Sequence, residues 1–195
     1  MSPLDEGRPR PPAPSSAAIS VRALAATDPI ASITALLHRA YEGQRRMGLD
    51  PLAGRQTIEQ TRRRCYRGQT FVALAGDGGS PSDGFAQRLV GTILFQERED
   101  AAFPAWFLRH DATHFSQFAV DPRMHGAGVG SLLLARIERE TLHAGKRELA
   151  LSMAEPDEPL RRYYERRGYR VVQDWRWPYT NYRSLILSKT LGEGA

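Results

Sequence analysis

The chain has 195 residues, of which 41% are hydrophobic, and its formal net charge of +5 comes from 27 basic and 22 acidic residues. This length and apolar content are typical of a single domain with one core. The only cysteine, Cys65, excludes a disulfide framework and a cysteine-based zinc site. No run of about 18 apolar residues indicates a transmembrane span, and no apolar stretch near the start indicates a secretory signal, so we expect a cytoplasmic protein. The basic balance suits an anionic ligand, whether a nucleotide or a nucleic acid.

The first part of the chain is predicted to begin with a tail and to contain two helices. Residues 1–18 are rich in Pro, Ser and Ala and are expected to form a disordered tail, so that the folded domain occupies 19–193. Asp28 is a candidate N-cap for the first helix, with Pro29 at its first position. A second, strongly basic helix is predicted at 55–67.

Alternating and apolar runs predict seven strands, at 19–24, 70–75, 89–96, 113–120, 147–153, 169–175 and 184–190. Two further helices are predicted, one from residue 128 and one at 160–167, where Gly168 is a natural C-terminal residue. The long connection at 97–111 is of a length that is often functional. The element order is β-α-α-β-β-β-α-β-α-β-β, which predicts an α/β fold with a mixed sheet and helices on both faces.

The segment from Thr113 to Glu140 is predicted to form a strand, a glycine-rich turn and an amphipathic helix. Strict alternation places Phe115, Gln117 and Ala119 on one side of the strand and Ser116, Phe118 and Val120 on the other. The turn contains Gly126, Gly128 and Gly130. Glycines at a helix N-terminus let a ligand approach the backbone, and the unpaired amides together with the helix dipole favour an anion, most often a phosphate.

Two familiar phosphate-binding motifs do not fit this turn. A Walker-type loop needs Lys before Ser, but Gly130 precedes Ser131. A dinucleotide fingerprint that began at Gly126 would need glycine at position 131, and no ribose-binding acid follows at the right distance. The turn is therefore interpreted as a pyrophosphate site of another kind.

Three motifs together resemble those of the GNAT (Gcn5-related N-acetyltransferase) superfamily, over about residues 19–191. The most specific is Phe118-Ala119-Val120-Asp121-Pro122 followed by His125-Gly126-Ala127-Gly128-Val129-Gly130. The others are Leu160-x-x-Tyr163-Tyr164-Glu165-x-x-Gly168-Tyr169 and Leu89-Val90-Gly91-Thr92-Ile93. His125 stands where the family usually has Arg or Gln, and Met153-Ala154-Glu155 lacks an Asn that is often found there.

The resemblance implies a GNAT fold with a mostly antiparallel sheet, and acetyl-CoA as cofactor. The pyrophosphate of the cofactor would bind the amides of His125, Gly126, Ala127, Gly128, Val129, Gly130 and Ser131. Its pantetheine arm would pair like an added strand with the backbone of Phe118, Ala119 and Val120, where an amide could polarise the thioester carbonyl.

The resemblance also implies direct transfer of an acetyl group to a primary amine of a small molecule or a peptide. Tyr164 matches the position of the acid that protonates the leaving thiolate. Glu97, at the end of a strand, is the candidate base and would act through water. Each has a structural alternative: Tyr164 as a packing residue and Glu97 as a solvated charge. His110 and His114 are rival bases because histidine titrates near neutral pH.

Other readings remain open at this stage. The same fold could serve a non-catalytic acyl-CoA sensor, and the arginines of the second helix could bind nucleic acid, although no motif supports the latter. A group of aromatic residues could line an acceptor pocket, or could equally form a core or a homodimer surface. These residues are Tyr41, Trp106, Trp175, Trp177, Tyr179 and Tyr182.

Overall fold

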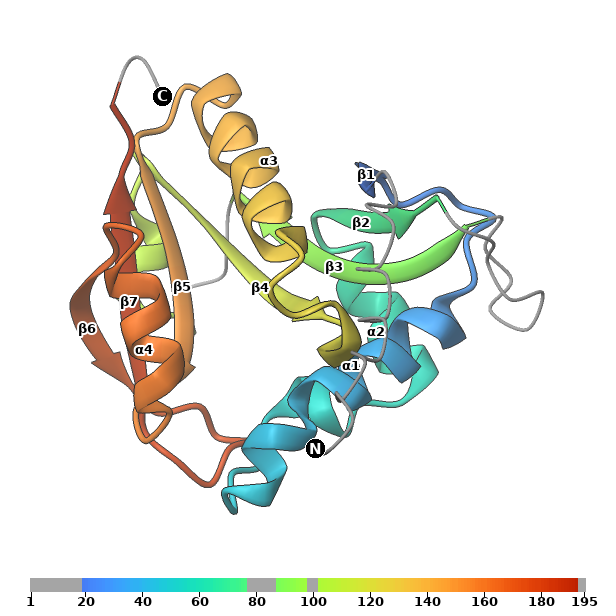
Figure 1. Ribbon diagram of the computed structural model, residues 1–195. Helices are drawn as coiled ribbons and strands as arrows, with labels where there is room; N and C mark the ends of the chain where they lie inside the picture. Colours follow the sequence, from blue (N-terminus) through green and yellow to red (C-terminus); the bar gives the residue numbers. More distant parts are fainter. Residues whose placement is uncertain (1–18, 77–86, 98–101, 193–195) are drawn as a thin grey trace, which may run out of the picture.

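The computed structural model (Figure 1) describes residues 19–76, 87–97 and 102–192. The expected tail at 1–18 lies outside these ranges, as does most of the loop between the second and third strands. Seven strands form one sheet in the order β1-β2-β3-β4-β5-β7-β6. They are β1 (Ile19–Ala23), β2 (Gln69–Ala75), β3 (Arg88–Gln96), β4 (Ala112–Val120), β5 (Glu148–Ala154), β6 (Arg170–Trp175) and β7 (Ser184–Thr190).

Every pair of neighbouring strands is antiparallel except β4 and β5. These two strands run parallel and pair only from Ala112 to Phe115 on β4 and from Glu148 to Leu151 on β5. Beyond this short ladder they spread apart, as the yellow and orange arrows of Figure 1 show. The predicted mixed, mostly antiparallel sheet is therefore confirmed, and the sheet opens in its middle.

Helices cover both faces of the sheet, as predicted. On one face α3 (Val129–His143) and α4 (Glu158–Glu165) contribute to the largest apolar core, which contains Leu133, Ile137 and Tyr164. On the other face α1 (Ile30–Arg46) and α2 (Ile58–Cys65) pack on β2 and β3. Short 3₁₀ turns lie at Leu52–Gly54, Ala105–Leu108 and Pro122–Met124. No helix in the described ranges is long and apolar enough to cross a membrane.

The starts of the first two helices differ from the prediction. Helix α1 starts at Ile30, and Asp28 does not cap it. The Asp28 carboxylate instead accepts hydrogen bonds from Arg22, at 2.6 and 2.8 Å, and from the Ala25 amide. Helix α2 starts at Ile58 rather than at residue 55, because Thr57 and Gln60 form a reciprocal capping box there.

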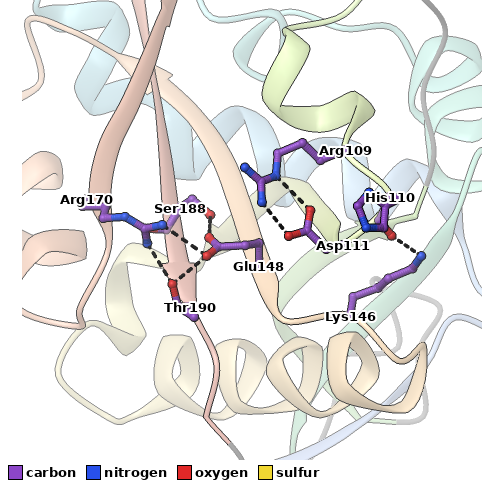
Figure 2. Close-up of polar contacts among 8 residues, drawn as sticks. All are labelled: Arg109, His110, Asp111, Lys146, Glu148, Arg170, Ser188 and Thr190. Carbon is purple, nitrogen blue, oxygen red and sulfur yellow. Dashed lines mark hydrogen bonds and ion pairs between the residues drawn. The ribbon is translucent and has the colours of Figure 1, made fainter.

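Polar contacts hold the closed end of the sheet, where β4 and β5 pair (Figure 2). Glu148 at the start of β5 is buried and accepts hydrogen bonds from Ser188, from Thr190 at 2.6 Å and from Arg170 at 3.1 Å. These donors lie on β7 and β6, so one carboxylate ties three strands together. Nearby, Lys146 donates to the carbonyl oxygen of His110.

Candidate active site

A bulge in β4 changes which side chains face which side of the sheet. The register between β3 and β4 shifts between Thr92 and Leu94, and Gln117 has a positive φ of 49°. Phe115 therefore packs in the same core as Phe118, with ring centroids 5.9 Å apart, whereas Ala119 packs against the α1 side. The predicted grouping of Phe115 with Gln117 and Ala119 was wrong, because an inserted residue reverses the alternation that follows it.

A large cavity of about 1430 Å³ lies in the opening between β4 and β5. One wall is β4 from His114 to Val120, and the other is β5 from Leu151 to Ala154. Because the two strands do not pair here, the Ser116–Val120 edge of β4 has no strand partner on the β5 side. An extended ligand can pair with such an edge as an added strand.

The glycine-rich turn lines the same cavity. Gly126 and Gly128 both have φ of +82°, a conformation that glycine adopts without the steric cost of a Cβ atom. Gly128 is the N-cap residue of α3, and the first backbone hydrogen bond of the helix runs from the Leu132 amide to the Gly128 carbonyl, at 3.0 Å. Within the described ranges, the amides from Gly128 to Ser131 donate no hydrogen bond to another backbone or side-chain group.

These free amides suit a phosphate group. They stand at the positive end of a 15-residue helix, where an anion is stabilised by both the amides and the helix dipole. The hydroxyl of Tyr163 lies close enough to Gly130 that a Cβ atom there would be 3.0 Å from it. Arg167 also lines this part of the cavity, with its guanidinium 3.7 Å from the ring centroid of Tyr163. The free amides thus lie near Tyr163 of α4 and Arg167, which follows this helix. Of the predicted phosphate-binding amides, those of His125 and Ala127 are not free, because they donate to the carbonyls of Pro122 and Met124 at 3.3 and 3.2 Å.

Tyr164 reaches the same cavity from α4. Only 3% of the residue is exposed, and its ring packs 5.5 Å from that of Tyr169 and 6.1 Å from that of Phe115. Burial, with a smaller contribution from nearby tyrosines and Asp157, raises the pKa of Tyr164 well above its ordinary value. The phenol is therefore neutral and can donate a proton.

The predicted bases occupy different places. Glu97 lies exposed at the end of β3 and does not line the cavity, although the preceding residue, Gln96, does. His114 lines the cavity and is buried, with its ring stacked on Phe107 at 4.2 Å. His110 is exposed at the closed end of the sheet. Among the described residues, Asp157 is the one carboxylate that lines the cavity.

Four of the six aromatic residues singled out above line the cavity, namely Tyr41, Trp177, Tyr179 and Tyr182. Trp106 and Trp175 instead pack in a small core around Phe107 on the β5–β7 part of the sheet. The sequence reading missed Phe103, Phe107 and Tyr163, which also line the cavity. The length of the connection at 97–111 was the available signal for Phe103 and Phe107.

The sequence matches the family model described as "Acetyltransferase (GNAT) family" over residues 32–169, which is more than half of the chain. The chain belongs to the GNAT family. The cavity between β4 and β5, with the glycine turn at its side, is therefore the candidate active site of a GNAT protein. No curated protein matches the sequence.

Solved GNAT structures share the fold at low sequence identity. The ribosomal-protein-S18-alanine N-acetyltransferase from Escherichia coli is 15% identical with a TM-score of 0.63, and the match covers 91% of this chain and 97% of that one. An acetyltransferase from Streptococcus agalactiae is 17% identical with a TM-score of 0.62, covering 89% and 98%. A GNAT family acetyltransferase from Elizabethkingia anophelis, solved with acetyl-CoA bound, is 14% identical with a TM-score of 0.58, covering 89% and 98%.

Proposed function

We propose that this GNAT protein is an acetyl-CoA-dependent N-acetyltransferase that acts on a primary amine of a small molecule or a peptide. One observation carries the proposal: the unbonded amides of the glycine turn, the open edge of β4 and the neutral phenol of Tyr164 all face a single cavity. The first two features suit the pyrophosphate and the extended arm of a CoA thioester. The phenol of Tyr164 suits protonation of the CoA sulfur as it leaves.

The chain's own residues would hold acetyl-CoA as follows. The free amides from Gly128 to Ser131, with Arg167 beside them, would bind the pyrophosphate, because the amides of His125 and Ala127 are already engaged. The backbone of Phe118, Ala119 and Val120 would pair with the pantetheine arm. When bound, acetyl-CoA supplies an activated acetyl group as a thioester. An amide of this β4 segment, next to the bulge at Gln117, would donate to the carbonyl oxygen on which negative charge develops.

Tyr164 would then protonate the departing thiolate. Burial raises the pKa of the phenol, which makes it a weaker acid. The same apolar surroundings raise the pKa of a thiol, because the thiolate is a charge removed from water. Both groups are therefore shifted in the same direction, and proton transfer between them stays feasible.

Removal of the proton from the amine is assigned to Glu97 acting through water. Its exposed position, beside the cavity-lining Gln96, does not place it in direct contact with an amine in the cavity. Asp157 is the competitor, but it already caps α4 through the Leu160 amide and accepts a hydrogen bond from Gln44 at 2.8 Å. A fall in kcat/KM with Glu97→Gln, but not with Asp157→Asn, would support the assignment.

The proposal is tested by measuring acetyl-CoA binding by calorimetry and CoA release with a panel of amines. Binding together with amine-dependent release of CoA is expected. Binding without transfer to any amine would instead indicate a non-catalytic acyl-CoA sensor. The absence of both would overturn the proposal.

A further inference from the structure

Helix α2 presents arginines to the cavity, and one of them differs from its neighbours. Arg63 and Arg64 of α2, and Arg67 just after its end, all line the cavity wall. Arg63 is paired with Glu59 at 3.9 Å, and Arg67 lies over the ring of Phe103 at 5.6 Å. Arg64 donates one hydrogen bond, to the Gln56 side-chain oxygen at 2.7 Å, and forms no ion pair with any carboxylate of the described ranges.

Arg64 is held in place by a buried network rather than by solvent. Gln56 is fully buried, and its amide donates to Thr61 at 2.9 Å and to Gln117 in the β4 bulge at 2.7 Å. Thr61 in turn accepts a hydrogen bond from Thr34 of α1 at 2.8 Å. Because the links from Gln56 to Thr61 and Gln117 are buried, Gln56 fixes the end of the partly buried Arg64 side chain against the cavity and ties it to the bulge next to the proposed thioester site.

Within the described ranges, no carboxylate pairs with the charge of Arg64. Burial lowers the pKa of Arg64, and the electrostatic effects of Tyr41 and Tyr179 oppose this shift without cancelling it. The only carboxylate that lines the cavity among the described residues, Asp157, is engaged with Gln44 and with the Leu160 amide. A guanidinium taken partly out of water without an acid is costly, and an anionic ligand would relieve that cost.

Arg64 belongs to a different end of the cavity from the glycine turn. Tyr179, its neighbour, lies on the connection between β6 and β7, which reaches across to α1 at the bottom of Figure 1. This connection is tied there by hydrogen bonds from Arg55 to the Tyr179 carbonyl, at 2.6 Å, and from Asn181 to the Gly48 carbonyl, at 2.8 Å. The anion that Arg64 would bind is therefore not the pyrophosphate expected at α3.

The rest of this end is apolar and aromatic. Phe103 and Trp177 meet edge to face with ring centroids 5.4 Å apart, and Trp177 stacks on Tyr179 at 5.6 Å. Leu52 and Met47 complete the lining. An acceptor bound here would present a negative group to Arg64 and an apolar body to these rings.

We propose that the acceptor is a small amine that also carries a carboxylate, of the class of α-amino acids with an apolar side chain, and that Arg64 binds its carboxylate. This inference rests on the proposed acetyl-transfer function, whose amine acceptor it specifies. The planar guanidinium can form two parallel hydrogen bonds to a carboxylate, which fixes orientation as well as charge. The amine would then extend toward Tyr41, whose pKa is affected by Arg64, and beyond it toward Tyr164.

The test compares three acids with their amides as acceptors: L-phenylalanine, L-leucine and L-methionine against the corresponding L-amino acid amides. We expect kcat/KM for at least one acid to exceed that of its amide by at least about tenfold, the factor that corresponds to one lost hydrogen bond to a charged group. Amine basicity works against this result, because the amide has the less basic amine and a larger neutral fraction. Equal use of acid and amide would overturn the inference while leaving acetyl transfer intact.

Variants on α2 connect the preference to Arg64. Arg64→Gln should abolish the preference for the acid and raise its KM, so that the ratio of kcat/KM for the acid to kcat/KM for the amide falls to about one. Arg64→Lys keeps the positive charge but cannot form two parallel hydrogen bonds to a carboxylate, so it should retain part of the preference. Arg62→Gln is the matched control, because Arg62 is exposed on the same helix, pairs with Glu59 at 3.9 Å and does not line the cavity. A preference that survives in Arg64→Gln would overturn the inference.

A binding measurement separates failure of this inference from failure of the proposed function. Calorimetry of the three acids with protein saturated with CoA requires no transfer. Binding that weakens in Arg64→Gln and not in Arg62→Gln supports the carboxylate site even if no CoA is released with any amine. If none of the acids binds or reacts, the inference is wrong. Unfolding temperature and acetyl-CoA affinity, measured for each variant, verify that the fold and the cofactor end are intact.

Discussion

The protonation state of a single buried residue sets the expected pH dependence of the proposed reaction. Burial raises the pKa of Tyr164 above its ordinary value of 10.0, so the phenol keeps its proton at neutral and moderately alkaline pH. We therefore expect kcat to rise with pH as the amine loses its proton, with no decline caused by Tyr164 below pH 10. Tyr164→Phe should lower kcat by about 10²-fold, the lower range for loss of a general acid, while acetyl-CoA affinity is unchanged. Steady-state kinetics from pH 6 to pH 10 measure both effects.

Tyr169 provides the matched control for this substitution. It packs in the same core as Tyr164, burial also raises its pKa, and its hydroxyl is buried without a hydrogen bond within the described ranges. It does not line the cavity. Tyr169→Phe should therefore leave kcat unchanged, and a wild-type kcat in Tyr164→Phe would remove Tyr164 from the proposed mechanism.

Among single residues, the sequence allows prediction of those whose role depends on their neighbours in the chain, and not of those whose role depends on tertiary contacts. The glycine turn could be predicted from local spacing, because an anion site at a helix N-terminus depends on neighbouring residues. Tyr164 was predicted from its place in a motif that resembles the GNAT family. Arg64 could not be separated from Arg62, Arg63 and Arg67, because its distinction is a partly buried contact with Gln56 and the lack of an ion pair among the described residues. Such properties depend on which segments the fold brings together, and no local pattern records them.

Among the elements, the strands were predicted more accurately than the helix ends and the register. All seven strands lie within a residue or so of the predicted segments, because alternation and turn residues mark them. The side chains of β4 were assigned wrongly after Phe115, since the bulge at Gln117 depends on pairing with β3. Likewise, Asp28 was taken as a helix cap although it pairs with Arg22 of the preceding strand. Both errors reflect tertiary contacts overriding a local rule.

Substitution of Glu148 measures how much one carboxylate contributes to the stability of the strand ends of β5, β6 and β7 that it joins. Burial alone would raise its pKa, but hydrogen bonds from Ser188, Thr190 and Arg170 lower it below the ordinary value of 4.5. The carboxylate thus contributes stability that is fully present above pH 4.5 and is lost as the pH falls through the lower pKa of the folded state. Glu148→Gln should reduce the free energy of unfolding at pH 7 by about 1–3 kcal/mol, with a smaller difference from wild type at pH 3. Urea denaturation at both pH values measures this.

The control for Glu148 is an exposed glutamate that also pairs with an arginine. Glu165 on α4 accepts from Arg161 at 2.8 Å, with both side chains about 40% exposed. Glu165→Gln should cost less than about 1 kcal/mol, because solvent screens such pairs. If the loss of unfolding free energy in Glu148→Gln were the same at pH 7 and pH 3, the side chain would stabilise the fold through packing rather than through its negative charge.

On the scale of the whole molecule, the sheet is two halves joined at one end. The β1–β4 half carries α1 and α2, the β5–β7 half carries α4, and the two pair only along the short ladder from Ala112 to Phe115. At the open end, Gln44 of α1 donates to Asp157 at the start of α4, and the β6–β7 connection contacts the α1 side through Tyr179 and Asn181. The sequence predicted the element order but not these contacts, because residues far apart in the chain form them.

Hydrogen exchange should reveal how a CoA ligand uses this opening. The β4 amides from Ser116 to Val120 that face β5 and the turn amides from Gly128 to Ser131 lack strand or helix partners on the cavity side. Exchange of these amides is limited by local exposure rather than by global unfolding, so ligand contact should slow it directly. Mass spectrometry with CoA should show protection in peptides that cover both segments, whereas ADP, which has the pyrophosphate without the pantetheine arm, should protect only the turn. Peptides from β1 and β6, at the outer edges of the sheet, serve as internal controls. Equal protection of β4 by ADP and CoA, or protection spread evenly over the chain, would contradict the placement of the arm along β4.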